Sequence, residues 1–189
     1  MPIWRNTPTR YGAIAQTFHW LIVALVIVQF ALGHMADDMP LGIQKLATLA
    51  RHKSLGMTIL MLAVLRLAWR LRDPPPPLPA GMPDWEKRAA HITHALLYIL
   101  LFALPLTGWL MSSAKNFPVS WFGLFTFPDL VAPDPELEEV LEETHEMLGW
   151  LLAATAVLHA LAALRHHFIR HDDVLRRMLP LPRGAGEGR

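Results

Sequence analysis

Four long apolar stretches restrict this chain more than any other feature of its sequence. They cover residues 18–33, 54–69, 95–114 and 147–164. A helix needs about 20 mostly apolar residues to cross a hydrocarbon core of about 30 Å. Only 17% of the residues are charged, whereas soluble domains carry about a quarter. We therefore predict an all-α integral membrane four-helix bundle, with spans at about 14–34, 52–71, 94–114 and 145–165.

Interruptions and connections define the rest of the chain. Arg66 lies inside the second stretch, where its guanidinium must reach a headgroup region, and Pro105 should kink or loosen the third helix. The segment DPPPPLPAGMPDW at 73–85 cannot be helical and is typical of an extended polyproline spacer. We assign residues 10–182 to one transmembrane domain and residues 183–189 to a disordered tail.

The basic residues are distributed unevenly between the two sides of the predicted bundle. Thirteen of the 17 Lys and Arg lie before the first span, between the second and third spans, or after the fourth. Cytoplasmic loops carry an excess of Lys and Arg, so we predict that both termini and the Pro-rich loop are cytoplasmic. A cleaved signal peptide is the alternative for the first stretch, but that stretch is long for a signal peptide, and GHMADD offers no small-x-small cleavage site.

Ten histidines and no cysteine form the second unusual feature of the composition. The absence of cysteine excludes disulfides, thiolate zinc sites, iron–sulfur clusters and haem attached through thioether bonds. Polar side chains in membrane spans are costly, which makes them functional candidates. Four histidines lie in the predicted spans or at their ends: His19, His52, His145 and His159.

Depth in the membrane sorts these four histidines into two pairs. His145 and His159 are fourteen residues apart in one predicted helix. They are therefore separated by about 21 Å along the axis and by only about 40° around it. His145 is level with His52 near the outer end, and His159 is level with His19 near the inner end. We therefore predict two facing imidazoles near the outer end and two near the inner end.

Haem ligation is the simplest chemistry for two neutral imidazoles at each depth. Gly56 and Gly149 each follow a histidine of the outer pair by one turn, which predicts room for a planar ligand. For any single histidine, the alternative and commoner role is a hydrogen bond between helices. A zinc or iron site needs about three or four converging ligands, and each depth offers mainly two. His94 is a secondary candidate, because it would line the inner pocket or replace His19.

The sequence says less about the roles of the other polar residues near the spans. Arg66 and Arg70 lie one turn apart and are candidates for neutralising haem propionates, although the positive-inside rule explains them equally well. We expect solvated or lipid-facing side chains for His166, His167 and His171, which follow the fourth span, and a polar helix terminus at His34.

Five stretches closely resemble the bacterial cytochrome b561 family of four-helix membrane dihaem proteins, which is related to the cytochrome b subunits of nickel hydrogenases and formate dehydrogenases. They are RYGAIAQTFHWLIVAL, RHKSLGMTILMLAVLRLAWRL followed by PPPPLP, THALLYILLFALPLTGWLMSSA, THEMLGWLLAATAVLHALAAL and HHFIRHDDVLRRMLP. The resemblance implies two haem b groups, one bound by His19 with His159 and one by His52 with His145. It also implies a multi-pass protein of the bacterial inner membrane.

The resemblance implies electron exchange with ubiquinone as well. One member type oxidises superoxide at the outer, periplasmic face and passes the electron to quinone. A superoxide:ubiquinone oxidoreductase would need positive charge on an otherwise acidic outer face. Arg51, Lys53 and Lys115 are the candidates for attracting the anion, and lipid phosphate is the alternative partner of each lysine.

Two other functions fit the same residues. The chain could be the haem-bearing membrane anchor subunit of a dehydrogenase or hydrogenase-like complex, with a redox partner subunit docked on the Pro-rich loop and on HDDVLRRMLP at 171–180. Metal-ion transport through the histidine pairs would instead give bound zinc or free iron and no haem spectrum. We expect the lipid bilayer and quinone as partners, and no nucleic acid.

Overall fold

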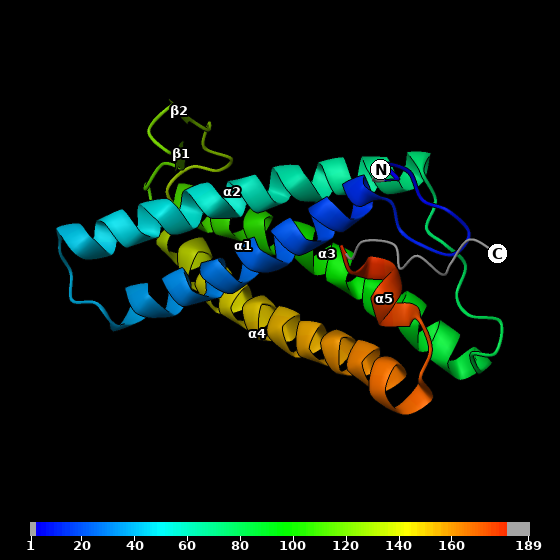
Figure 1. Cartoon of the computed structure of the whole chain (residues 1–189). Coiled ribbons are helices and arrows are strands. Elements are labelled where there is room, and N and C mark those ends of the chain that lie inside the picture. Colours follow the sequence, from blue (N-terminus) through cyan, green and yellow to red (C-terminus); the bar gives the residue numbers. More distant parts are fainter. Residues whose placement is uncertain (1–2, 181–189) are drawn as a thin grey trace.

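The computed structural model of the chain describes residues 3–180, and it is a bundle of four long helices (Figure 1). These are α1 (Ala13–Asp38), α2 (Ile43–Arg72), α3 (Asp84–Ala114) and α4 (Pro135–Arg165). Each contains one of the predicted spans and is long and apolar enough to cross a membrane. The predicted all-α membrane bundle is confirmed.

The helices extend beyond the apolar stretches, because polar residues continue them past the hydrocarbon core. α4 is capped by Asp134, whose Oδ1 accepts hydrogen bonds from the backbone N–H groups of Glu136 and Leu137, both at 3.1 Å. Such a cap satisfies donors that the first helical turn leaves free. α3 already begins at Asp84. The prediction that the whole Pro-rich segment is non-helical was therefore wrong for Asp84 and Trp85, which follow the last proline.

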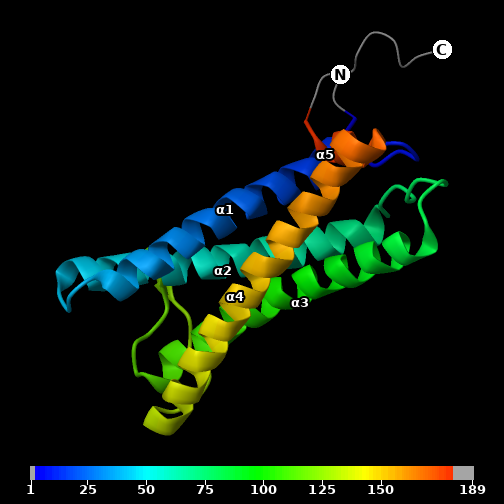
Figure 2. The ribbon, with the colours of Figure 1, turned by 90° about the horizontal axis from the view of Figure 1, so that it is seen from below.

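The bundle consists of two helix pairs. α1 packs on α2, α3 packs on α4, and the two pairs meet where α2 packs on α3. Within the described residues α4 does not pack closely on α1 or α2, and Figure 2 shows it crossing them obliquely. Ile22, Ile59 and Leu101 belong to the buried core. Large side chains such as Ile27 and Leu158 are exposed on the outside, as expected for a surface that faces lipid.

The two ends of the bundle differ in what covers them (Figure 1). The segment before α1, the Pro-rich segment and the short helix α5 (Val174–Met178) lie at one end, which we call the terminal end. A β-hairpin of β1 (Ser120–Trp121) and β2 (Phe125–Thr126) lies at the other, which we call the hairpin end. The β-hairpin is fastened to α2, because Trp121 Nε1–H donates to Thr58 Oγ1 at 3.1 Å.

The C-terminal part of the described chain folds back onto α1. A π-helical turn, η1 (His166–Arg170), connects α4 to the segment that leads into α5. The carbonyl of Arg177 accepts a hydrogen bond from the backbone N–H of Tyr11 (3.2 Å), and the carbonyl of Met178 accepts one from Trp20 Nε1 (2.9 Å). The tail predicted to be disordered, 183–189, lies outside the described residues.

His166 is buried, so the expectation of a solvated or lipid-facing side chain was wrong at this position. Its Nδ1 lies 2.5 Å from Asp172 Oδ2, and its Nε2 lies 3.7 Å from Glu86 Oε2. Glu86 also accepts hydrogen bonds from Arg165 (3.1 Å) and Arg170 (2.7 Å). These polar groups tie the start of α3 to the end of α4. The apolar pattern could not reveal them, because the turn after η1 brings Asp172 back to His166.

Candidate functional site

The structure brings the four singled-out histidines together as two pairs. At the hairpin end, the ring centroids of His52 on α2 and His145 on α4 are 6.2 Å apart, with the ring planes at 69°. At the terminal end, the centroids of His19 on α1 and His159 on α4 are 6.3 Å apart, at 78°. Each pair therefore joins α4 to a helix on which it does not pack closely.

The spacing of both pairs fits a single metal ion between two imidazoles. Each metal–nitrogen bond is about 2 Å long and each ring nitrogen lies about 1 Å from its ring centre, so two opposed axial imidazoles have centroids about 6 Å apart. Both measured separations agree with this value. Among the described residues no group of three or more His, Cys, Asp or Glu converges as a metal site. The donor set is thus that of two axial imidazoles per site, which suits haem iron.

Thr107 on α3 is the hydrogen-bonding neighbour of His145 Nδ1. The Thr107 hydroxyl donates its proton to the Leu104 carbonyl at 2.9 Å, and its oxygen lies 3.1 Å from His145 Nδ1. When the hydroxyl proton is used in this way, the oxygen is free to accept a hydrogen bond from Nδ1–H of His145. The lone pair of the ring is then on Nε2, the atom that would bind iron. Sequence reasoning missed Thr107, because nothing in its spacing shows that it faces α4.

Two glycines make room for the rings of the hairpin-end pair. A Cβ at Gly108 would lie 3.1 Å from His145 Cε1, and a Cβ at Gly33 would lie 3.5 Å from His52 Cε1. The sequence prediction placed this room at Gly56 and Gly149, and Gly56 lines a cavity that His52, Gly108 and His145 also line. A Cβ at Gly56 would lie 3.2 Å from Gln29 Nε2, and one at Gly149 would meet no atom within 4 Å. Helix rotation, which the sequence does not give, decides which glycines face the histidines.

At the terminal end a third histidine joins the pair. The ring centroid of His94 on α3 lies 5.2 Å from that of His159. This separation is shorter than the about 6 Å of two opposed axial ligands, so His19 fits the role of axial partner better. Arg66 Nη2 lies 3.2 Å from His19 Nδ1, and Arg66 has no carboxylate partner among the described residues. Arg66 also lies over the ring of Tyr98, with Cζ 5.5 Å from its centroid.

The three basic candidates at the hairpin end differ in how they are engaged. Lys53 Nζ donates to Ser112 Oγ and to the carbonyl oxygens of Phe117 and Pro118, at 3.0, 2.9 and 3.1 Å. All three acceptors are neutral, so none of them compensates the charge of Lys53, and the contacts hold the segment that leads into the β-hairpin.

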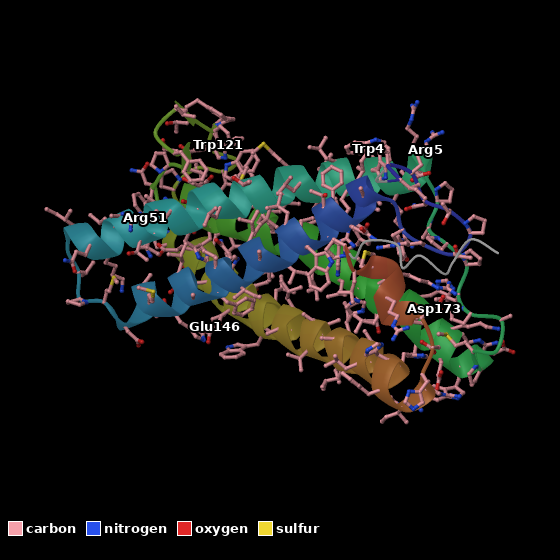
Figure 3. The ribbon with its side chains drawn as sticks, in the orientation of Figure 1. Trp4, Arg5, Arg51, Trp121, Glu146 and Asp173 are labelled. Carbon is pink, nitrogen blue, oxygen red and sulfur yellow. The ribbon has the colours of Figure 1, made fainter. Side chains whose placement is uncertain are left out.

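Lys115 and Arg51 contrast with Lys53. Lys115 forms a salt bridge with Glu138, which raises the pKa of Lys115 and compensates its charge. Arg51 is exposed and lies at the same end of the bundle as Trp121 and Glu146 (Figure 3). Of the three candidates, Arg51 and Lys53 are therefore the ones without a carboxylate partner among the described residues.

Comparison with known proteins agrees with this arrangement. The family model for prokaryotic cytochrome b561 matches residues 10–181. Cytochrome b561 homolog 2 of Escherichia coli is 40% identical over 188 residues, which cover 92% of this chain and 93% of the relative. Probable superoxide oxidase CybB of Yersinia pestis is 31% identical over 175 residues, covering 93% and 98%. Cytochrome b561 homolog 1 of Escherichia coli is 30% identical over 175 residues, covering 90% and 97%. This chain, with four helices able to span a membrane, belongs to the prokaryotic cytochrome b561 family of membrane electron-transfer proteins, and this membership implies that it binds haem b.

Proposed function

We propose that this chain is a dihaem electron-transfer protein that oxidises superoxide at the periplasmic face and reduces ubiquinone. His52 and His145 would hold one haem b at the hairpin end, and His19 and His159 would hold the other at the terminal end. The observation that carries the proposal is the spacing of the two pairs, 6.2 and 6.3 Å between ring centroids, with both pairs sharing α4. One pair at this spacing could be coincidence, whereas two pairs at two depths favour a relay.

The protein's own residues set the conditions for this chemistry. Haem b held by a pair of these histidines would supply one-electron exchange at its edge. Thr107 keeps a proton on His145 Nδ1 and so presents Nε2 to the metal. Arg66, which has a donor at the edge of His19 and no carboxylate partner among the described residues, suits the neutralisation of a haem propionate.

The orientation of the bundle follows from its charges. Basic residues dominate the terminal end, which supports a cytoplasmic location for it and a periplasmic location for the hairpin end. Superoxide is an anion, so the positive charges of Arg51 and Lys53 would raise its local concentration near His52. The Yersinia pestis relative is named a probable superoxide oxidase, which supports this choice of electron donor.

Haem counting tests the ligand assignment. We expect a pyridine haemochrome assay on the purified protein to give two haems per chain, and one haem after a His→Ala change at position 19, 52, 145 or 159. His94→Ala is the matched control, because it removes an imidazole of the same cluster that we do not assign as a ligand. Loss of a haem in His94→Ala with both haems kept in His19→Ala would overturn the terminal-end pairing.

Turnover tests the activity. The purified chain in lipid should consume superoxide and reduce a short-chain ubiquinone in a ratio of two to one, since each superoxide carries one electron and the quinone takes two. A protein with two haems that transfers no electrons from superoxide, and that co-purifies only with a dehydrogenase, would point instead to the membrane-anchor role.

A further inference from the structure

The connection between α3 and α4 contains an uncharged segment that is rich in aromatic residues. Between Lys115 and Asp129 the chain has thirteen residues without a charge, and five of them are Phe or Trp. Exposed apolar patches of this kind are typical of surfaces that contact a protein or a membrane. The function proposed above uses none of these aromatic side chains.

The segment folds back along the bundle instead of projecting beyond its end. On the α2 side, Trp121 Nε1 donates to Thr58 Oγ1 at 3.1 Å. On the α3 side, Trp109 Nε1 donates to the carbonyl of Pro128 at 3.0 Å. Thr58 lies four residues inside the apolar stretch of α2, and Trp109 lies five residues inside that of α3. Both contacts are therefore about 6–7.5 Å deeper in the membrane than the ends of those stretches.

At this depth the β-hairpin stands beside a face of α2 that is open to lipid. Figure 1 shows β1 and β2 at the side of α2, set back from its first turns. Ser54 Oγ accepts a hydrogen bond from the backbone N–H of Phe122 at 3.1 Å. Met61 and Leu65 follow Ser54 by seven and eleven residues, which places them on the same face of α2, and both are exposed. The β-hairpin is thus continuous with a surface that faces lipid.

The turn of the β-hairpin presents large apolar side chains to its surroundings. Phe122, Leu124 and Phe125 are 52%, 74% and 48% exposed. The backbone N–H of Leu124 donates to the carbonyl of Trp121 at 2.9 Å, which makes the turn tight. Phe122 and Gly123 both have positive φ, 50° and 74°. Asn-Gly is the usual pair for such a turn, and a bulky residue at positive φ is strained. Water would not stabilise the exposed ring, whereas lipid would.

We propose that the β-hairpin is inserted into the lipid leaflet at the hairpin end, where its three exposed side chains Phe122, Leu124 and Phe125 meet the boundary between headgroups and acyl chains. Lipid is the partner, because the β-hairpin lies beside the exposed face of α2 at a depth where α2 itself is in hydrocarbon. Aromatic residues are enriched at this boundary. The proposal needs only a bundle that spans a membrane, and it does not depend on the electron-transfer function proposed above.

The inserted segment also reaches the hairpin-end histidines. Val119, which directly precedes β1, is buried and lines the same cavity as His52 and His145. One end of the segment thus closes a wall of the candidate site, while its turn enters the lipid. Insertion would hold this wall at a fixed depth in the leaflet.

The test measures how often a spin label collides with dioxygen, which concentrates in hydrocarbon, and with a neutral nickel chelate, which stays in water. The full chain with its haems is placed in nanodiscs of phosphatidylethanolamine and phosphatidylglycerol, and each rate is referred to the same sample under nitrogen. The chain has no cysteine, so Leu124→Cys carries a single label, and Phe125→Cys repeats the measurement on β2. Leu41→Cys is the reference in water, because Leu41 is 91% exposed in the connection between α1 and α2 at the same end.

We expect the ratio of oxygen to nickel collisions to be about tenfold higher at positions 124 and 125 than at 41, the size expected when a polar solute is excluded from partly apolar surroundings. Leu130→Cys is the matched control in the same connection. The backbone N–H of Leu130 donates to Ser113 Oγ at 3.1 Å, close to the end of α3, and its side chain is exposed. Its ratio should lie between those at positions 41 and 124.

Two results would overturn the proposal. Ratios at 124 and 125 equal to the ratio at 41 would show that the β-hairpin lies in water. Few collisions with both agents would show that a protein surface, such as a second copy of the chain, covers it. A haem spectrum equal to that of the parent in each labelled variant establishes that the fold is intact.

Discussion

Removing the Thr107 hydroxyl should weaken haem binding at the hairpin end alone. Thr107→Val keeps the shape of the side chain but removes the oxygen that lies 3.1 Å from His145 Nδ1. A buried donor without a partner costs about 1–3 kcal/mol, and loss of a group that orients a metal-ligating histidine lowers affinity about 10- to 100-fold. The two estimates agree, since about 1.4 kcal/mol corresponds to a factor of ten. We expect haem loss from this site to be faster by that factor.

The measurement is the rate of haem transfer to excess apomyoglobin, followed by absorbance, with one fast and one slow phase in the variant. Thr107→Ser should restore the parent rate, because serine supplies the same oxygen. Thr155→Val is the matched control. Thr155 is buried on α4 and its hydroxyl donates to the Leu151 carbonyl at 2.7 Å, with no histidine as a recorded partner. Equal transfer rates in Thr107→Val and the parent would refute the tautomer argument.

Four further substitutions test the hairpin end. Gly108→Ala should lower haem occupancy about tenfold, because the added Cβ would lie 3.1 Å from His145 Cε1. Gly33→Ala should be tolerated, because its Cβ would lie 3.5 Å from His52 Cε1, an ordinary contact distance. Equal haem content in both variants would contradict this prediction. Lys53→Met should make protease cleavage within the β-hairpin segment about tenfold faster, because three hydrogen bonds are lost, and unchanged cleavage would show that other contacts hold the segment. Since Glu138 raises the pKa of Lys115 above 10.5, their pair contributes stability below that pH and loses it as pH rises through the raised pKa. The thermal midpoints of the parent and Lys115→Met should therefore converge in strong alkali, and a constant difference would argue against the pair.

The sequence was sufficient for the features that depend on hydrophobic length and on depth. Apolar runs identified the four helices, and the rise per residue placed His145 level with His52 and His159 level with His19. Residues whose role depends on helix rotation about its own axis were missed or misread. The sequence does not show that Gly108 and Gly33 face the two histidine rings, nor that Thr107 contacts His145. A single chain carries no signal for such rotations.

The ends of the helices were the second source of error. Hydropathy marks where a helix leaves the hydrocarbon, but polar residues with good caps continue the helix beyond that point. His166 was expected to be solvated for a related reason. Its surroundings are created by His171, whose backbone is left-handed (φ 55°), and by the turn that follows, which returns Asp172 to the bundle. Local sequence does not predict such a reversal.

The division of the bundle into two helix pairs has a consequence for assembly. His19 and His52 belong to the α1–α2 pair, whereas His145 and His159 both belong to α4. Under the proposed ligation, each haem crosslinks the α1–α2 pair to α4, and so connects one half of the protein to the other. The first haem to bind therefore fixes the distance that the second one requires, so loading is expected to be cooperative. The chain without haem would be two helix pairs held together chiefly where α2 meets α3, and the cofactor that carries the electrons would also complete the fold.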